Sequence, residues 1–258
     1  MATTGFKQDL NLFLAEMRRS AKLLKTYPID TVNSIASFLI MSVVFMVGIN
    51  AVGDSSQVFG VIFFPVMLNL ISGPSASIRS DIELGVFEQV YISRYSLIKT
   101  AILRTLISGL TSLIGSVLIG LIMHFFFLPI NISAPAIGLL FVLFTVQSIA
   151  AGVLMAAITL RFRKVDTLLN FCNILIMIEL VLPLNRITSL LGFVPMAVVP
   201  FYGVVVLYQQ FLGSYPMSDL LPTLICTLLN TAALVAAAHF IYRKSMVAAK
   251  KNGTLGQY

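Results

Sequence analysis

Apolar runs about as long as a membrane-spanning helix recur along this 258-residue chain and constrain its fold more than any other feature. A helix needs about 20 apolar residues to cross the hydrocarbon core, whereas a strand of a membrane barrel needs only about 10. Hydrophobic residues make up 58% of the sequence and charged residues 10%, against about 25% charged residues in a soluble domain. A water-soluble fold of this size cannot hide so much apolar surface. The sequence therefore predicts an all-α integral membrane protein.

Six of these runs are predicted to span the membrane as helices. They cover about residues 32–52, 58–78, 101–128, 136–160, 167–184 and 220–241, all within one transmembrane domain, residues 31–258. Residues 1–30 differ, because apolar side chains recur there at mostly three- and four-residue spacing with Lys and Arg between them. That pattern is typical of a basic amphipathic helix lying in the membrane interface.

The positions of the basic residues predict the orientation in the cell (cytoplasmic or inner) membrane. With six spans and both termini in the cytoplasm, all of the 17 Lys and Arg residues except Arg186 lie inside. Residues 187–213 are apolar but contain Pro195 and Pro200. A seventh span there would move the basic C-terminal tail outside, against the positive-inside rule. This segment is therefore predicted to be a re-entrant hairpin on the outer side.

The longest polar interruption between two apolar runs is residues 80–99, SDIELGVFEQVYISRYSLIK. Gly85 can break or turn the chain. After it, apolar side chains recur at i,i+4 spacing, as at Phe87 and Tyr91, and residues so spaced share one face of a helix. The pattern predicts a short cytoplasmic amphipathic helix between two spans, and we expect it to be a docking surface for a cytoplasmic motor.

Motifs of enzyme chemistry are absent from the sequence. It contains no phosphate-binding G-x-x-x-x-G-K-[ST], no H-E-x-x-H and no G-x-S-x-G, so we expect no catalytic, cofactor or metal site in this chain.

Glu179 is the one acidic residue predicted deep within a span, where a charge costs about 2.5 to 3.5 kcal/mol on insertion scales. Asn170, Asn173 and Glu179 are predicted to line one polar stripe of a translocation pathway, and Asn69 of the second span is a further candidate. Alternatively, Glu179 lies close enough to the outer surface to be hydrated.

The 80–99 segment resembles the loop between the second and third spans in permease subunits of type-2 ABC exporters. That loop often reads acid-x-acid-x-Gly-Thr-Leu-Glu-Gln-Leu, followed shortly by Ser-Pro. The residues that match at the same spacing are Asp81, Glu83, Gly85, Glu88, Gln89 and Ser93. The departures are Val86 for Thr, Phe87 and Val90 for the two Leu residues, and Arg94 for Pro. Together with the N-terminal helix, the six spans and the outer hairpin, the resemblance covers essentially the whole chain.

The resemblance implies that two permease subunits, expected to be identical, form the pathway between them. Two separate ATPase subunits would bind ATP and Mg²⁺ in the cytoplasm, which explains why this chain lacks a phosphate loop. The segment after Gly85 would be the coupling helix seated in a groove of the ATPase, where Glu88 is expected to make a polar contact. The full set of coupling residues is Asp81, Glu83, Gly85, Phe87, Glu88, Gln89 and Tyr91.

The sequence leaves the cargo and one other class of transporter open. Short outer loops and mostly apolar spans favour export of a hydrophobic or amphipathic substrate, such as a drug, a natural product or a lipid-like molecule. Polysaccharides and lipid-linked glycans are the alternative cargo within the same family. An autonomous proton-coupled carrier or channel that uses Glu179 is the alternative from another class, and it would work without a partner.

Overall fold

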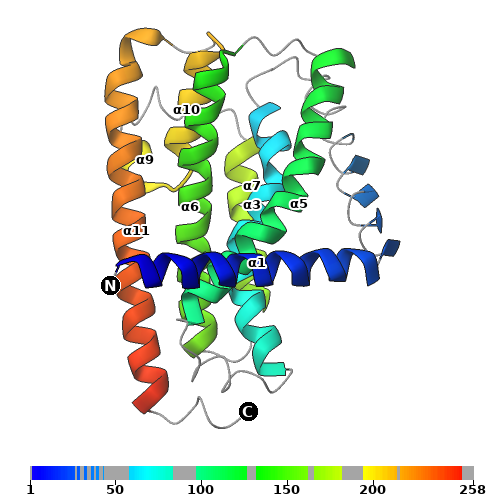
Figure 1. Ribbon diagram of the computed structural model, residues 1–258. Coiled ribbons are helices and arrows are strands. Elements are labelled where there is room, and N and C mark those ends of the chain that lie inside the picture. Colours follow the sequence, from blue (N-terminus) through cyan, green and yellow to red (C-terminus); the bar gives the residue numbers. More distant parts are fainter. Residues whose placement is uncertain are drawn as a thin grey trace.

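The structure of the chain is a computed structural model. It describes residues 2–26, 58–83, 97–126, 132–161, 166–181, 194–213 and 216–251, together with 28–29, 32–33, 36–37, 39–40 and 43. The regular elements in these ranges are all helical (Figure 1). The helices are α1 (Ala2–Thr26), α3 (Val58–Glu83), α5 (Leu97–Phe126), α6 (Ala134–Arg161), α7 (Asp166–Val181), α9 (Val194–Val198), α10 (Tyr202–Phe211), the 3-10 turn η2 (Met217–Asp219) and α11 (Leu220–Lys251).

Three of the described helices are long and apolar enough to cross a membrane. The stretches that qualify are Leu97–Ile122 in α5, Pro135–Arg161 in α6 and Met217–Ala249, which comprises η2 and most of α11. The predicted class, an all-helical multi-pass membrane protein, is therefore confirmed. Six spans are not shown, because α3 and the 16-residue α7 are not among the helices that qualify and most of the predicted first span, 32–52, lies outside the described residues.

The long helices form a bundle in which α3 packs against α5 and α6, and α6 packs against α11. Small residues allow the close approach of helices that membrane bundles favour. At Gly152 of α6 an added Cβ would overlap the backbone carbonyl oxygen of Leu70 in α3. At Gly73 of α3 it would come within 2.5 Å of Cγ2 of Thr105 in α5. Glycine at these two positions therefore sets the spacing of α3 from both neighbours.

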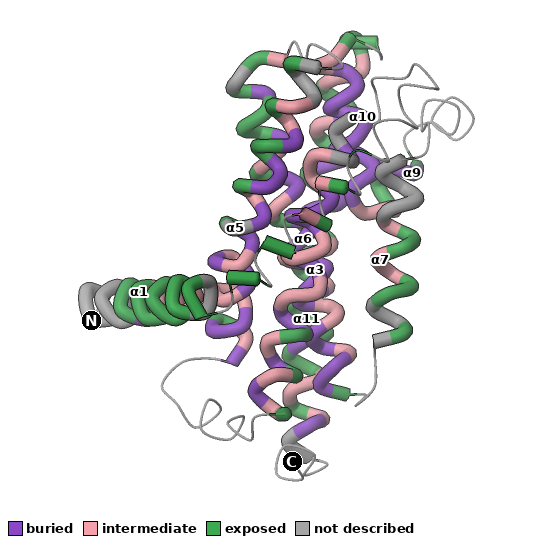
Figure 2. Tube along the Cα trace, turned by 90° about the vertical axis from the view of Figure 1, so that its right-hand side faces the viewer, coloured by how far each residue is buried: buried purple, intermediate pink, exposed green. Residues whose placement is uncertain are grey.

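Helix α1 runs crosswise to the bundle helices in Figure 1, and Figure 2 shows that it lies on one side of the bundle. It contacts the bundle through α5. Leu12 is buried, whereas Leu10, Leu14 and Met17 remain exposed beside Arg18 and other basic side chains. The amphipathic helix predicted within residues 1–30 is thus present, and its crosswise course is the one that an interfacial helix adopts.

Residues 194–213 form two short helices joined by a turn. They lie in the half of the bundle toward the end opposite the C-terminal end of α11 (Figure 1). Phe201, in the turn, has a φ of 67°, and α10 is buried from Tyr202 to Gln210. Pro195 occupies the first turn of α9, where the missing N–H of proline costs no helical hydrogen bond. Helix α10 is therefore an internal element of the bundle, whereas Val194 and Val198 of α9 remain exposed.

Candidate functional site

The ends of the predicted coupling loop belong to the two helices that flank it. Residues 80–83, including Asp81 and Glu83, continue α3, and residues 97–99 begin α5. The coupling residues Gly85, Phe87, Glu88, Gln89 and Tyr91 lie outside the described residues. The structure therefore describes both attachment points of the loop, and the site below is built at these points.

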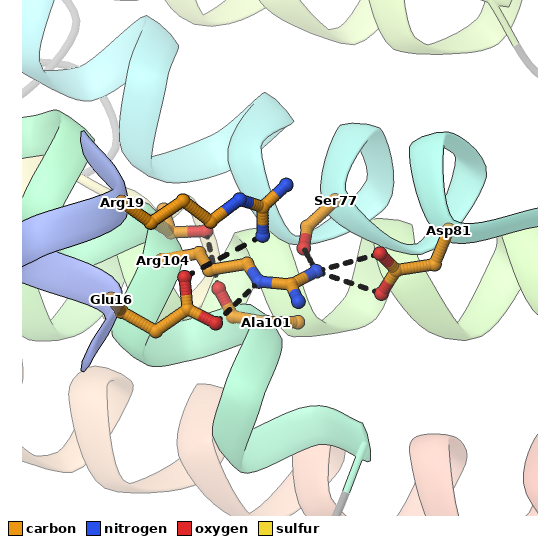
Figure 3. Close-up of polar contacts among 7 residues, drawn as sticks. Glu16, Arg19, Ser77, Asp81, Ala101 and Arg104 are labelled. Carbon is orange, nitrogen blue, oxygen red and sulfur yellow. Dashed lines mark hydrogen bonds and ion pairs between the residues drawn. The ribbon is translucent and has the colours of Figure 1, made fainter. Parts of the chain in front are cut away.

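Arg104 of α5 joins the end of α3 to helix α1 (Figure 3). Its Nη1 lies 2.8 Å from both carboxylate oxygens of Asp81 and 3.3 Å from Oγ of Ser77. Its Nε donates to Oε1 of Glu16 at 2.9 Å. Glu16 also forms an ion pair with Arg19, 3.5 Å from Oε2 to Nη1. We call Glu16, Arg19, Ser77, Asp81 and Arg104 the Arg104 cluster.

The cluster is largely shielded from solvent. The side chains of Asp81, Glu16 and Arg104 are 5%, 11% and 18% exposed, respectively. By contrast, the side chains of the ion pair between Arg79 and Glu83, which stand on either side of Asp81 in the sequence of α3, are 45% and 64% exposed. Exposed pairs contribute little to stability, whereas a buried charge that loses its partner is costly. The cluster is therefore the contact that fixes α1 relative to the ends of α3 and α5.

A cavity of about 300 Å³ opens beside the cluster, between α1, α3 and α5. Glu16, Arg19 and Arg104 form its charged wall. Hydroxyl groups dominate the rest of the polar lining, which comprises Ser20, Ser72, Ser77, Ser80, Thr105 and Ser108 together with Asn69. The cavity has room for water or for the polar part of a small amphipathic molecule.

Asn69 is the one predicted pathway residue that lines this cavity. Its Nδ2 also donates to Oγ of Ser112 in α5 at 2.5 Å and to the carbonyl oxygen of Pro65 at 3.2 Å. Asn170 and Asn173 belong to α7 and do not line it. About 100° of helical rotation per residue separates Asn170 from position 179 by about 180°. The three α7 positions therefore do not share the single stripe predicted for them, and the side chain of Glu179 lies outside the described residues.

A second polar contact, which sequence reasoning did not single out, holds the turn before α10. Gln147 of α6 is 1% exposed. Its Oε1 accepts the backbone N–H of Phe201 at 3.0 Å, and its Nε2 donates to Oγ1 of Thr231 in α11 at 2.8 Å. Asn230 donates to the carbonyl oxygen of Ala197 at 2.8 Å. Neutral side chains of α6 and α11 thus satisfy the backbone where α9 and α10 separate.

The residues of the Arg104 cluster were also missed at the level of sequence, apart from Asp81. In the sequence, Arg104 stands out only as one of the basic residues that set the topology, and nothing distinguishes Glu16. The two residues are 88 positions apart, so no local spacing indicates their pairing. A polar residue at the end of an apolar span, as at Arg104, is the only signal that the sequence offered.

Known protein families provide no match to this sequence, and neither do curated proteins. One guanidinium, that of Arg104, contacts Asp81 near the end of α3 and Glu16 of α1. Among the residues that the structure describes, no group of three or more His, Cys, Asp or Glu side chains has the arrangement of a metal site.

Proposed function

We propose that this chain is the membrane-spanning permease subunit of an ATP-driven exporter, and that residues 80–99 couple it to a separate ATPase. The resemblance of Asp81, Glu83, Gly85, Glu88 and Gln89 to the coupling loop of type-2 ABC exporters motivates the proposal. The Arg104 cluster is the observation that supports it most strongly. A loop that receives force from a cytoplasmic motor needs its two ends fixed to the rest of the molecule, and Arg104 makes that connection.

The proposed coupling begins when the ATPase moves the segment after Gly85. Displacement at Asp81 changes the geometry of its contact with Arg104, and Arg104 passes the change to Glu16 on α1. A guanidinium has five N–H donors, so Arg104 can hold Asp81 and Glu16 at the same time. The hydroxyl-lined cavity would supply polar partners to Glu16 and Arg104 while they move. Helices α3, α5 and α1 would therefore respond together.

The subunit composition, topology and cargo in this proposal follow from the resemblance to type-2 ABC exporters. A second permease subunit, expected to be identical, completes the pathway, and two ATPase subunits carry ATP and Mg²⁺. Both termini face the cytoplasm of the cell membrane, six spans cross it, and residues 187–213 form the outer re-entrant hairpin. The burial of α10 supports the last element, because broken helices at membrane depth require protein to cover their backbone. The cargo is hydrophobic or amphipathic, with a glycan as the alternative.

Purification in mild detergent followed by mass spectrometry tests the proposal directly. A stoichiometric second chain that carries a phosphate-loop lysine motif is the expected result. Glu88→Arg reverses a charge on the proposed coupling helix, so it should reduce the recovered ATPase at least about tenfold, because truncating or reversing a charge at an interface costs about 2 kcal/mol or more. Membrane insertion should be unchanged. A full complement of ATPase and normal transport in this variant would contradict the coupling role.

The autonomous proton-coupled carrier is the alternative function, and Glu179 distinguishes the two. The alternative predicts transport in liposomes without ATP and without a second chain, and this transport should be lost in Glu179→Gln. If the chain is an exporter permease, Glu179→Gln should still co-purify with the ATPase subunit, whatever its transport rate. Phe171→Leu, a change at an exposed position of the same helix that removes no acid, is the matched control. Partner-free transport that depends on Glu179 would replace the proposed function with the alternative.

A further inference from the structure

A second and larger cavity, of about 900 Å³, lies between the C-terminal end of α6 and the last turns of α11. Arg161, Arg243 and Lys244 line it, and no Asp or Glu is among its described lining residues. Apolar side chains, including Leu160, Ile241 and Val247, form much of the rest of the wall. Cations and apolar surface thus meet in one hollow, whereas in the cavity beside the Arg104 cluster carboxylates neutralise the cations.

The length of α11 places this cavity at a membrane boundary. The helix has 32 residues, which corresponds to about 48 Å at 1.5 Å per residue. About 20 residues cross the hydrocarbon core, so the turns that begin near Phe240 extend into the headgroup region. Figure 1 shows α11 continuing well past the level of the crosswise helix α1. A membrane lipid can therefore reach the cavity from the side without leaving its leaflet.

The cations in the cavity have chemistry that suits a phosphodiester. Arg243 has no carboxylate partner among the described residues, and a guanidinium binds phosphate oxygens in bidentate fashion. Nζ of Lys244 lies 4.4 Å from the centre of the Phe240 ring, and this contact holds the ammonium beside the apolar wall. An ammonium so placed adds a second charge next to the guanidinium.

We propose that this cavity binds the headgroup of an anionic phospholipid, with the acyl chains against the apolar residues of α6 and α11. Basic hollows between membrane helices on the cytoplasmic side are suited to such headgroups. The apolar lining favours a lipid over a soluble anion and over an acidic protein surface, because neither of these would cover Ile241 and Val247. The proposal requires only that the chain spans a membrane, and it is independent of the proposed transport function.

The absence of tryptophan from the sequence allows a sharp test with one introduced reporter. Phe240→Trp keeps an aromatic ring beside Lys244 and places a single fluorophore at the cavity. The full-length chain is reconstituted in phosphatidylcholine vesicles with increasing fractions of dibrominated phosphatidylglycerol or, in parallel, dibrominated phosphatidylcholine. Quenching gives the binding of the anionic lipid relative to the neutral one. We expect a saturable preference for phosphatidylglycerol, and its absence in this single-reporter protein would overturn the proposal.

Two double variants distinguish specific binding in the cavity from general attraction of cations to an anionic membrane surface. Arg243→Gln with Lys244→Gln should weaken the preference about thirtyfold, at about fivefold for each cation near the surface. The control double variant, Arg79→Gln with Lys99→Gln, removes two cations from the same end of the bundle but outside the cavity. It should change the preference for phosphatidylglycerol less than about twofold. Equal losses in both pairs would overturn the proposal. A Phe125→Trp reporter, at the far end of α5, should show no preference for the anionic lipid.

Other occupants of the cavity give different results in the same assay. Inorganic phosphate should leave the quenching by brominated phosphatidylglycerol unchanged, and displacement by phosphate would identify a soluble-anion site instead. The double variant Arg243→Gln, Lys244→Gln could instead keep the preference for phosphatidylglycerol but lose a co-purifying protein. In that case the two cations would belong to a protein interface. Either result would overturn the assignment to a lipid.

Discussion

The Arg104 cluster, where α1 meets the bundle, is built from charged side chains, whereas the contacts that hold α9 and α10 join neutral groups. Arg104 bridges two carboxylates and lies beside a cavity with a hydroxyl-rich lining. Gln147 instead bridges a backbone N–H and the hydroxyl of Thr231 at a position that is 1% exposed. Both contacts connect three parts of the bundle, so they differ in chemistry rather than in connectivity.

The cost of burial accounts for this difference. A charge within the membrane costs several kcal/mol unless it is paired or hydrated, whereas a neutral amide needs only its hydrogen-bond partners. The charged contact lies where α1 supplies a counter-charge and a polar cavity adjoins it, and the neutral contact lies in the interior. We infer that the first can rearrange during function, since partners for each charge are at hand, and that the second holds the buried turn in one conformation.

Loss of the cation at the Arg104 cluster should have the largest effect. Arg104→Met leaves Asp81 and Glu16 without their shared partner, and we expect a loss of about 3 kcal/mol in the free energy of unfolding. Arg79→Met is the matched control, because it removes the same kind of side chain from an exposed ion pair, for which about 0.5 kcal/mol is expected. Reversible denaturation with SDS in mixed micelles measures both values. Similar losses in the two variants would remove the distinction between the cluster and an ordinary surface pair.

Loss of the neutral contact should cost somewhat less. Gln147→Leu keeps the approximate volume of the side chain but leaves the buried N–H of Phe201 and the hydroxyl of Thr231 without this partner, at a cost of about 2 kcal/mol. Gln209→Leu is the control, because Oε1 of Gln209 is buried without a hydrogen-bond partner among the described residues. Its replacement should be close to neutral. An equal loss in both variants, measured in the same denaturation experiment, would show that packing rather than hydrogen bonding holds the turn.

Helical class and amphipathicity were predictable from the sequence because they depend on local patterns. The ends of the helices were less so. The predicted second span stops at residue 78, but α3 continues to Glu83, and α11 continues to Lys251 beyond the predicted limit of 241. Hydropathy reports where a helix leaves the hydrocarbon, whereas backbone hydrogen bonding continues into the polar region.

The two polar contacts show what the sequence does not contain. Glu16 and Arg104 are 88 positions apart, and Gln147 and Phe201 are 54 apart. Only the packing of the helices brings them together, so no periodicity or motif indicates either pair. Of the two prolines noted in this segment, Pro200 lies in the turn before α10, whereas Pro195 lies within α9. The partner that satisfies the broken backbone, Gln147, comes from a helix that the local sequence does not specify.

A change in ionic strength should have the smallest effect on stability. It compares the Arg104 cluster directly with the Gln147 contact. Raising the salt concentration from about 0.1 M to 1 M shortens the Debye length from about 10 Å to 3 Å. The stability difference between wild type and Arg104→Met should then shrink by less than about 1 kcal/mol, because water in the cavity lets ions approach a cluster that is only partly exposed. The difference for Gln147→Leu should not change, since neutral hydrogen bonds are not screened. If both differences respond equally to salt, the contact at Phe201 is hydrated as well, and the two regions do not differ in their access to water.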